Sequence, residues 1–410
     1  MAPPAGRGAA MNGRHEISSL HRREFLATAA ALLAAGVSRP ATAQRARALA
    51  ARPAVRAEDG IALLARGVNL SHWMWFPQAQ GERARRLFVT AADLDQLRSA
   101  GFTHVRLPFE PSWLWDESKR TFKAAEFTEY HDALRLCLAA GLAVIVDAHW
   151  SRTPWIRPRG ADFDERFGEL DRMWASLADR LADTEPDLVF LELVNEPHDL
   201  RDPEHWHDAQ RRIAATVRAV APRHTIIATG ADWGGIDGML RLEPLDDPNV
   251  VYSFHFYSPH NFTHQAAEWG FPPWKDMRGV PWPADRAELE RLAETFPQES
   301  RNALRWSARV GTEDPWSAEA LRASIRRAVE WSRRHGRPVY CGEFGVYTKA
   351  SPRESRLAWH RAVTDALREH RIGWSLWDYV GGFALATGEP AKRVLDQELL
   401  AALITREERR

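Results

Sequence analysis

The feature that most constrains the fold is a repeat of short apolar, β-branched segments, most of them followed by a helical pattern. Eight such segments occur in a chain of 410 residues, at positions 67–70, 104–107, 143–147, 189–194, 225–229, 250–256, 338–343 and 373–377. Strands that alternate with helices favour parallel βα units, and eight such units close into a barrel. The pattern therefore predicts an α/β protein with a single-domain (β/α)8 TIM barrel.

An open, doubly wound sheet is the second architecture that this rhythm allows. It would place a glycine-rich phosphate-binding loop after the first strand, but residues 67–70 are followed by Ser71-His72-Trp73. The barrel is therefore the preferred prediction.

One connection, residues 258–316, lacks the βα rhythm. It is rich in proline and holds five of the 18 tryptophans of the chain, namely Trp269, Trp274, Trp282, Trp306 and Trp316. A long connection inside a compact domain is usually functional or disordered, and so many side chains of the buried type favour order. We expect an aromatic-rich insertion after the sixth strand, which forms a lid over the barrel mouth.

The N-terminus has the composition of an export signal. His21-Arg22-Arg23-Glu24-Phe25-Leu26 resembles the twin-arginine signal, and an apolar run at 27–37 precedes Ala41-Thr42-Ala43, which is typical of a signal-peptidase site. The apolar run is too short to span a bilayer. We expect residues 1–43 to be a leader, residues 44–410 to form the folded domain, and the protein to be periplasmic or secreted. An alanine-rich N-terminal helix is the alternative.

The charge balance argues against several classes of partner. Lys and Arg total 55, and Asp and Glu also total 55, so nothing indicates an electrostatic grip on nucleic acid or an anionic membrane. The two cysteines, Cys137 and Cys341, are too few for a disulfide framework, and we expect two unpaired thiols. The sequence predicts no nucleic-acid partner, no membrane span and a monomer.

The carboxyl ends of the expected strands, where a barrel of this kind carries its active site, share one chemistry. Nearly every end has a polar residue that can hydrogen-bond a hydroxyl and an aromatic that can stack on a sugar ring. The ends read Asn69-Leu70-Ser71-His72-Trp73, Arg106-Leu107-Pro108, Asp147-Ala148-His149-Trp150, Asn195-Glu196-Pro197, Gly230-Ala231-Asp232-Trp233, His255-Phe256-Tyr257, Gly342-Glu343-Phe344-Gly345 and Trp377-Asp378-Tyr379. None is the ligand cluster that a metal needs, so the sequence implies neither a metal nor a cofactor.

This set resembles glycoside hydrolase family 5, whose barrels carry catalytic glutamates after strands four and seven. The resemblance covers about residues 66–379. Asn-Glu-Pro alone is a weak motif. Its combination with the later motifs, in this order along the chain, is specific: Asn195-Glu196-Pro197, then His255-Phe256-Tyr257, Gly342-Glu343-Phe344-Gly345 and Trp377.

The resemblance implies roles for two glutamates. Glu196 is expected to be the acid/base and Glu343 the nucleophile of a retaining mechanism, which needs two carboxyl groups roughly 5 Å apart. Arg106 and Tyr257 are expected to hydrogen-bond Glu343 and keep it ionised. We expect the negative charge of Glu343 and aromatic surroundings to raise the pKa of Glu196.

The expected substrate-binding residues surround this pair. By resemblance they are Arg106, His149, Asn195, His255, Tyr257 and Trp377. Three strand-end tryptophans are added as sugar contacts: Trp73, Trp150 and Trp233. Glu192 shares a face of its strand with Glu196, deeper in the barrel, and is interpreted as a structural carboxylate. Asp147 and Asp378 are interpreted as supporting hydrogen-bond acceptors.

The leading functional hypothesis is an endo-acting β-glucanase, most simply a cellulase-type enzyme that hydrolyses β-1,4-glucan. Exo action, or specificity for β-1,3-glucan, mannan or glycolipid, fits the same catalytic set. A carbohydrate-binding scaffold without catalysis is the alternative from another class, although all the expected catalytic positions are filled. As a further hypothesis, Trp269, Trp274 or Trp282 lines the cleft and limits the chain lengths that are accepted.

Overall fold

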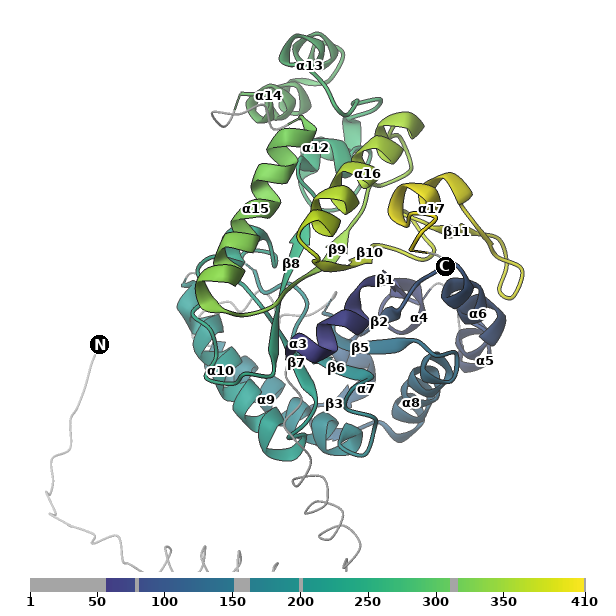
Figure 1. The fold of residues 1–410 in the computed structure, drawn as a ribbon, viewed down its shortest axis with the longest axis vertical. Helices are drawn as coiled ribbons and strands as arrows, with labels where there is room; N and C mark the ends of the chain where they lie inside the picture. The colour runs from purple at the N-terminus through teal and green to yellow at the C-terminus, as the bar shows by residue number, and fades with distance from the viewer. Residues whose placement is uncertain (1–56, 78–80, 151–162, 199–201, 310–315, 409–410) are drawn as a thin grey trace, which may run out of the picture. The chain divides into compact units, whose positions relative to one another are not determined.

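The computed structural model of the protein describes residues 57–77, 81–150, 163–198, 202–309 and 316–408 (Figure 1). The expected leader, residues 1–43, lies outside the described residues. So do the first residues of the expected domain, 44–56.

The predicted (β/α)8 barrel is confirmed. Eight parallel strands close into a barrel in which the order around the ring follows the order along the chain. The strands are β1 (Arg66–Asn69), β2 (His104–Phe109), β5 (Ala143–Ala148), β6 (Val189–Glu192), β7 (Thr225–Thr229), β8 (Val250–Phe256), β9 (Val339–Phe344) and β10 (Gly373–Leu376). Apart from Arg66, every residue in them is buried, which explains the nearly continuous apolar runs in the sequence.

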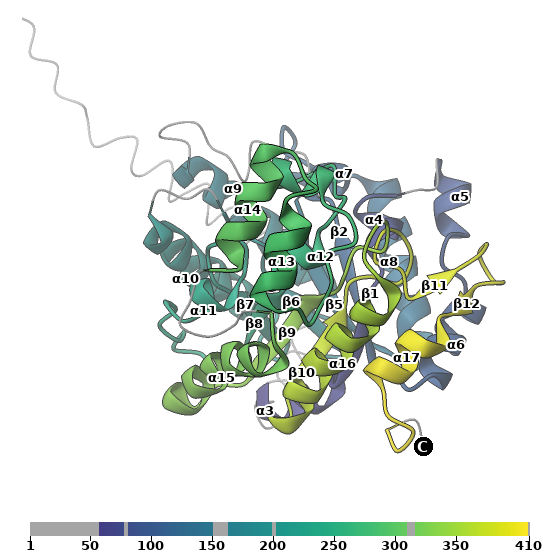
Figure 2. The same ribbon diagram turned by 90° about the horizontal axis from the view of Figure 1, so that it is seen from above.

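Helices lie outside the ring of strands (Figure 1). Outside the connection 258–316, the longer ones are α6 (Ala91–Ser99), α8 (Ala124–Ala139), α9 (Phe163–Leu181), α10 (Pro203–Val220), α15 (Ala318–His335), α16 (Arg353–Glu369) and α17 (Gln397–Leu403). Figure 2 shows α15 and α16 side by side, in agreement with their contacts. Local sequence sets their ends: Thr90 and Asp93 form a capping box on α6, and Gly336 ends α15 with a left-handed φ of 62°.

Short elements complete the connections between the longer ones. They are α4 (Ser71–Met74), α5 (Glu82–Arg86), α7 (Pro111–Leu114), α11 (Ile236–Met239), and two small hairpins, β3 (Trp115–Asp116) with β4 (Thr121–Phe122) and β11 (Ala386–Thr387) with β12 (Val394–Leu395).

The amino ends of the strands are closed by α3 (Ala57–Gly60) and the 3-10 turn η1 (Ile61–Leu64). Ala57 and Leu64 are fully buried in a small apolar core inside the barrel. The strand residues of this core are Ala143, Ile145, Phe190, Ile227, Val251 and Tyr340. This apolar packing closes the barrel at the amino ends of the strands. The active site is therefore expected at the carboxyl ends.

The connection 258–316 is an ordered helical segment within its described residues. It contains α12 (His260–Thr263), the 3-10 turn η2 (Pro272–Asp276), α13 (Arg286–Ala293) and α14 (Gln298–Ser307), and α13 and α14 pack together at the top of Figure 1. The fully buried side chain of Gln265 ties two parts of this segment together. Its amide accepts from Val280 N–H at 2.8 Å and donates to Val280 C=O at 3.0 Å.

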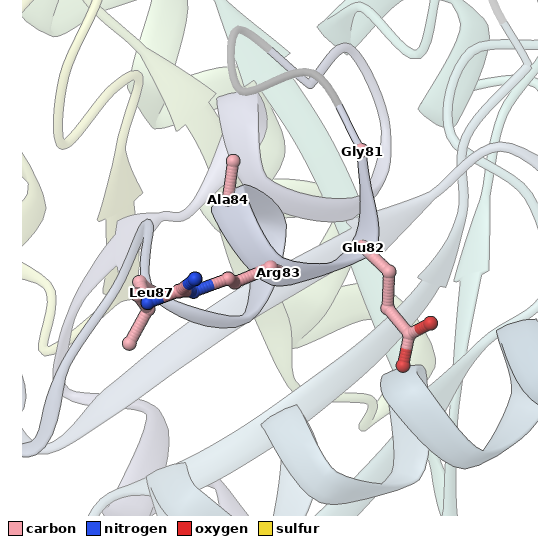
Figure 3. Close-up of a pocket in the computed structure, with 5 residues that line it drawn as sticks. All are labelled: Gly81, Glu82, Arg83, Ala84 and Leu87. Atoms are coloured by element: carbon pink, nitrogen blue, oxygen red, sulfur yellow. The ribbon is translucent and has the colours of Figure 1, made fainter.

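A pocket of about 500 Å³ lies on and beside α5 (Figure 3). It is lined by Gly81, Glu82, Arg83, Ala84 and Leu87. None of these residues belongs to the set expected at the active site.

Within the described ranges, no helix combines the length and apolar character needed to cross a bilayer. Cys137 on α8 and Cys341 on β9 are both buried and unpaired, as the sequence predicts.

Candidate active site

Most of the expected site residues meet at the carboxyl ends of the strands. They are Arg106 in β2, His149 after β5, Asn195 and Glu196 after β6, His255 in β8, Tyr257 after it, Glu343 in β9 and Trp377 after β10. Strand register places the inner partners side by side: Asn69 beside Arg106, Asp147 beside Glu192, and His255 beside Glu343. Position 342, next to Glu343, has no space for a side chain, because a Cβ there would lie 2.6 Å from Ser253 Oγ.

The fully buried guanidinium of Arg106 is the centre of the site. Its Nε and Nη2 donate to the two carboxylate oxygens of Glu192 at 2.7 and 3.0 Å. Its Nη1 donates to Asn69 Oδ1 at 2.9 Å and to Glu343 Oε1 at 2.7 Å. Its Nη2 also donates to Asn195 Oδ1 at 2.8 Å. All five N–H donors of an arginine are therefore used.

A third carboxylate, that of Asp147, lies 3.0 Å from Arg106 Nη2. Asp147 and Glu192 are both fully buried. Burial raises the pKa of Asp147 to about 6, against the opposing charge of Arg106, and raises the pKa of Glu192 as well. One cation thus faces three carboxylates, counting Glu343, so negative charge is in excess around the guanidinium.

Glu343 is held at both carboxylate oxygens. Arg106 donates to Oε1, and the Tyr257 hydroxyl donates to Oε2 at 2.8 Å. Burial raises the pKa of Glu343, while the positive charge of Arg106 lowers it. The predicted hydrogen bonds are present, but the structure adds a desolvation effect that the sequence did not reveal.

Glu196 is the more accessible of the two glutamates, with 21% of its side chain exposed against 5% for Glu343. Its Oε1 lies 2.6 Å from Nδ1 of His255. Burial raises the pKa of Glu196 to about 8, Arg106 opposes this, and the charges of Asp147 and Glu192 add to it. The direction agrees with the sequence prediction, but the cause is burial and the two inner carboxylates.

Glu196, His255 and Glu343 form a compact cluster in which one ligand atom of each lies within 4.8 Å of the others. In the described part of the chain, this is the one group of His, Cys, Asp and Glu side chains with the spacing of metal ligands. A cation bound there would meet the guanidinium of Arg106, which already lies 2.7 Å from Glu343. The arrangement is therefore better suited to proton transfer and nucleophilic attack.

Aromatic rings line the site on the side of β1, β5 and β10. Nδ1–H of His149 donates to Asp147 Oδ2 at 2.8 Å, and the His149 ring stacks on Trp377, with ring centroids 5.4 Å apart. Trp75 packs against both rings, and its ring centroid lies 4.2 Å from that of His149 and 5.5 Å from that of Trp377. Trp75 was not among the predicted site residues, and its place in a loop rich in tryptophan was the only signal for it.

The three tryptophans predicted as sugar contacts differ in exposure. The prediction for Trp73 is wrong, because its ring is 2% exposed in the apolar core and its Nε1 donates to Arg85 C=O. Trp150 is also buried, at 8%. Trp233 is 51% exposed and lies parallel to the ring of His198, with centroids 3.4 Å apart.

The chain is similar to known proteins over most of its length. The sequence model of the family described as "Cellulase (glycosyl hydrolase family 5)" matches residues 58–382. Endoglucanase C of Acetivibrio thermocellus is 28% identical over 320 residues, which cover 76% of this chain and 90% of that protein.

The chain is also similar to solved structures. The Cel5A structure of Thermotoga maritima in complex with cellobiose has a TM-score of 0.68 and 25% identity, and covers 85% of this chain and 100% of that one. The structure of the same Thermotoga protein in complex with mannotriose has a TM-score of 0.68 and 26% identity, with the same coverage.

Replacing Arg106 by Met should destabilise the fold strongly at neutral pH, by about 3–5 kcal/mol, because three buried carboxylates lose their common cation. Without the cation their folded-state pKa values rise further above the unfolded values, which favours folding at low pH and opposes it as the pH rises. The loss should therefore shrink as the pH falls. Chemical denaturation at several pH values measures this.

Arg85→Met is the matched control, because Arg85 also makes a bidentate pair with a buried glutamate, Glu129, but keeps 17% of its side chain exposed. Its loss should be smaller. Equal losses for the two variants at every pH would contradict a special role for Arg106.

Proposed function

The chain belongs to glycosyl hydrolase family 5, and on that premise we propose that it is an endo-acting β-1,4-glucanase that retains the anomeric configuration of its substrate. That it is a glycoside hydrolase follows from the family. The retaining mechanism is supported by the separation of Glu196 and Glu343, whose facing oxygens lie within 4.8 Å.

This separation favours a double displacement. In retaining glycosidases the two carboxyl groups lie about 5–5.5 Å apart, whereas inverting ones keep roughly 6.5–9.5 Å to leave room for a water molecule between the groups. The shorter separation leaves space for one carboxylate to attack the sugar directly. A covalent glycosyl-enzyme then forms and is hydrolysed in a second step.

The surroundings of the two groups support a division of roles. Glu343 is nearly buried and held at both oxygens by Arg106 and Tyr257, which suits a nucleophile of fixed orientation. Glu196 is more exposed, and its pKa of about 8 keeps it protonated at neutral pH, as a general acid requires.

The proposed hydrolysis takes place in two steps. Glu196 gives its proton to the glycosidic oxygen while a Glu343 oxygen bonds to the anomeric carbon and the leaving sugar departs. Glu196, now ionised, takes a proton from water, whose oxygen displaces Glu343 from the anomeric carbon. Both glutamates return to their starting states. His255 lies beside both carboxylates, at 2.6 Å and 3.6 Å, and is neutral because burial lowers its pKa.

Neighbouring side chains suit a sugar at the point of cleavage. The carbonyl oxygen of Asn195 accepts from Arg106, so its NH₂ group is left as the donor for a substrate hydroxyl. Trp377, stacked on His149, offers an apolar floor. We assign Asn195, His149, His255 and Trp377 to this subsite.

The choice of β-1,4-glucan rests on similarity. The Acetivibrio relative is named an endoglucanase, and the Thermotoga structure was determined with cellobiose. Mannan is the second candidate, because the same Thermotoga protein was also determined with mannotriose. The geometry of the two glutamates serves both.

A panel of defined oligosaccharides tests the substrate. The purified protein should hydrolyse cellotetraose with a kcat/KM at least about tenfold above that for β-1,3-linked glucotetraose, a difference of ~1.4 kcal/mol in transition-state binding. Mannotetraose shows whether the specificity is dual. Preference for the β-1,3-linked substrate, or release of single sugars from one end only, would overturn the assignment.

Glu196→Ala should lose most activity on cello-oligosaccharides but retain the first step on an aryl glycoside whose leaving group needs no protonation. Azide should then rescue turnover, because a small anion enters without a general base. The product should be the β-glycosyl azide, as two inversions require. An α-azide, or no rescue at all, would show that the roles or the stereochemistry are wrong.

The basic limb of the pH profile should report Glu196. Because its pKa is raised to about 8 and the protonated form is the active acid, kcat/KM on cello-oligosaccharides should fall as the pH rises through about 8. An aryl glycoside with a good leaving group should show a much weaker basic limb. An identical basic limb on both substrates would mean that another group titrates.

A further inference from the structure

The insertion presents an aromatic side chain whose exposure the catalytic chemistry leaves unexplained. Trp269 is 50% exposed, and its neighbour Phe271 is 48% exposed. Of the other tryptophans considered for the cleft, Trp282 is 3% exposed, and Trp274 is partly buried in a stack with His264. Trp269 is therefore the one of the three that offers a large ring surface to a ligand.

A row of aromatic contacts joins Trp269 to the nucleophile. Its ring meets Tyr347 edge-to-face, with centroids 4.7 Å apart at 80°. Tyr347 packs on Phe383 at 5.5 Å, and Phe383 on Tyr257 at 6.2 Å. The hydroxyl of Tyr257 donates to Glu343. Three ring contacts thus link the exposed indole to Tyr257, which holds the proposed nucleophile.

Backbone hydrogen bonds brace the segments that carry these rings. Tyr347 N–H donates to Thr263 C=O at 2.8 Å, which ties the loop after β9 to the insertion. Ala266 N–H donates to Trp274 C=O at 2.8 Å. Gly270 turns the chain with a φ of 76°, and a Cβ there would lie 2.6 Å from the ring of Trp274. Trp269 therefore projects from a braced turn, which lowers the entropy cost of using it for binding.

We propose that Trp269 and Tyr347 form a further sugar-binding subsite that takes a glucosyl residue of the same chain, beyond the residues at the point of cleavage. A sugar ring buries its C–H face against an indole without needing a charged partner, and the row of rings links Trp269 to Tyr257 beside Glu343. The inference rests on the proposed function. It makes Trp269 a determinant of chain-length preference.

The test compares Trp269→Ala with the parent protein on cellotriose and cellohexaose. The measured quantity is the ratio of kcat/KM on the long substrate to that on the short one. Loss of one stacking contact should lower this ratio by about three- to tenfold. Trp269→Phe should restore part of it, because a smaller aromatic face remains.

Trp306→Ala is the matched control. Trp306 belongs to the same insertion, on α14, and is 68% exposed, but it has no part in the row of rings. Its ratio should equal that of the parent. A ratio for Trp269→Ala that also equals the parent value would overturn the subsite, including the case in which both substrates slow equally.

The activity of the parent protein separates an error in the subsite from an error in the proposed function. If the parent protein hydrolyses no cello-oligosaccharide, the proposed β-1,4-glucanase is wrong, and the ratio is measured on the β-glycan that it does hydrolyse. If the parent hydrolyses cello-oligosaccharides and Trp269→Ala keeps the parent ratio, only the subsite is wrong.

Discussion

Arg106 has five N–H donors, and acceptors from three other barrel strands and the loop after β6 meet all of them. Glu192 takes two in a fork, which fixes the plane of the guanidinium. The remaining donors then point at Asn69, Asn195 and Glu343. The positions of Glu343, the proposed nucleophile, and of the Asn195 amide beside Glu196, the proposed acid, therefore depend on one buried cation, and the orientation of that cation depends on Glu192, a carboxylate deeper in the barrel.

The same cation leaves a charge imbalance that shapes the chemistry. It faces Asp147, Glu192 and Glu343, and burial lowers the pKa of both His149 and His255, so neither imidazole supplies a second positive charge. Burial raises the pKa of Glu196, and the charges of Asp147 and Glu192 raise it further, which favours its protonated form. An acid at neutral pH beside an anchored carboxylate is the condition that double displacement requires.

Much of this could be predicted from the sequence, because the βα rhythm gave the barrel and the strand ends gave the polar residues. What escaped prediction depends on three-dimensional detail. The single turn of α4 sends Trp73 into the core and leaves Trp75 at the site, a choice that no period in the sequence encodes. Strand register places Asp147 beside Glu192. Because the sequence does not reveal this register, it could not predict that the two carboxylates together raise the pKa of Glu196. Trp269 is exposed and Trp282 is buried, and this difference depends on how the insertion folds, which the sequence alone does not reveal.

Trapping the covalent intermediate would identify the nucleophile directly. A 2-fluoro-substituted cellobioside with an activated leaving group forms the glycosyl-enzyme but slows its hydrolysis, because the fluorine destabilises the positively charged transition state. Mass spectrometry of the inactivated protein should show one cellobiosyl adduct per chain, and peptide sequencing should place it on Glu343. An adduct on another carboxylate, or inactivation without any adduct, would contradict the proposal that Glu343, held by Arg106 and Tyr257, is the nucleophile.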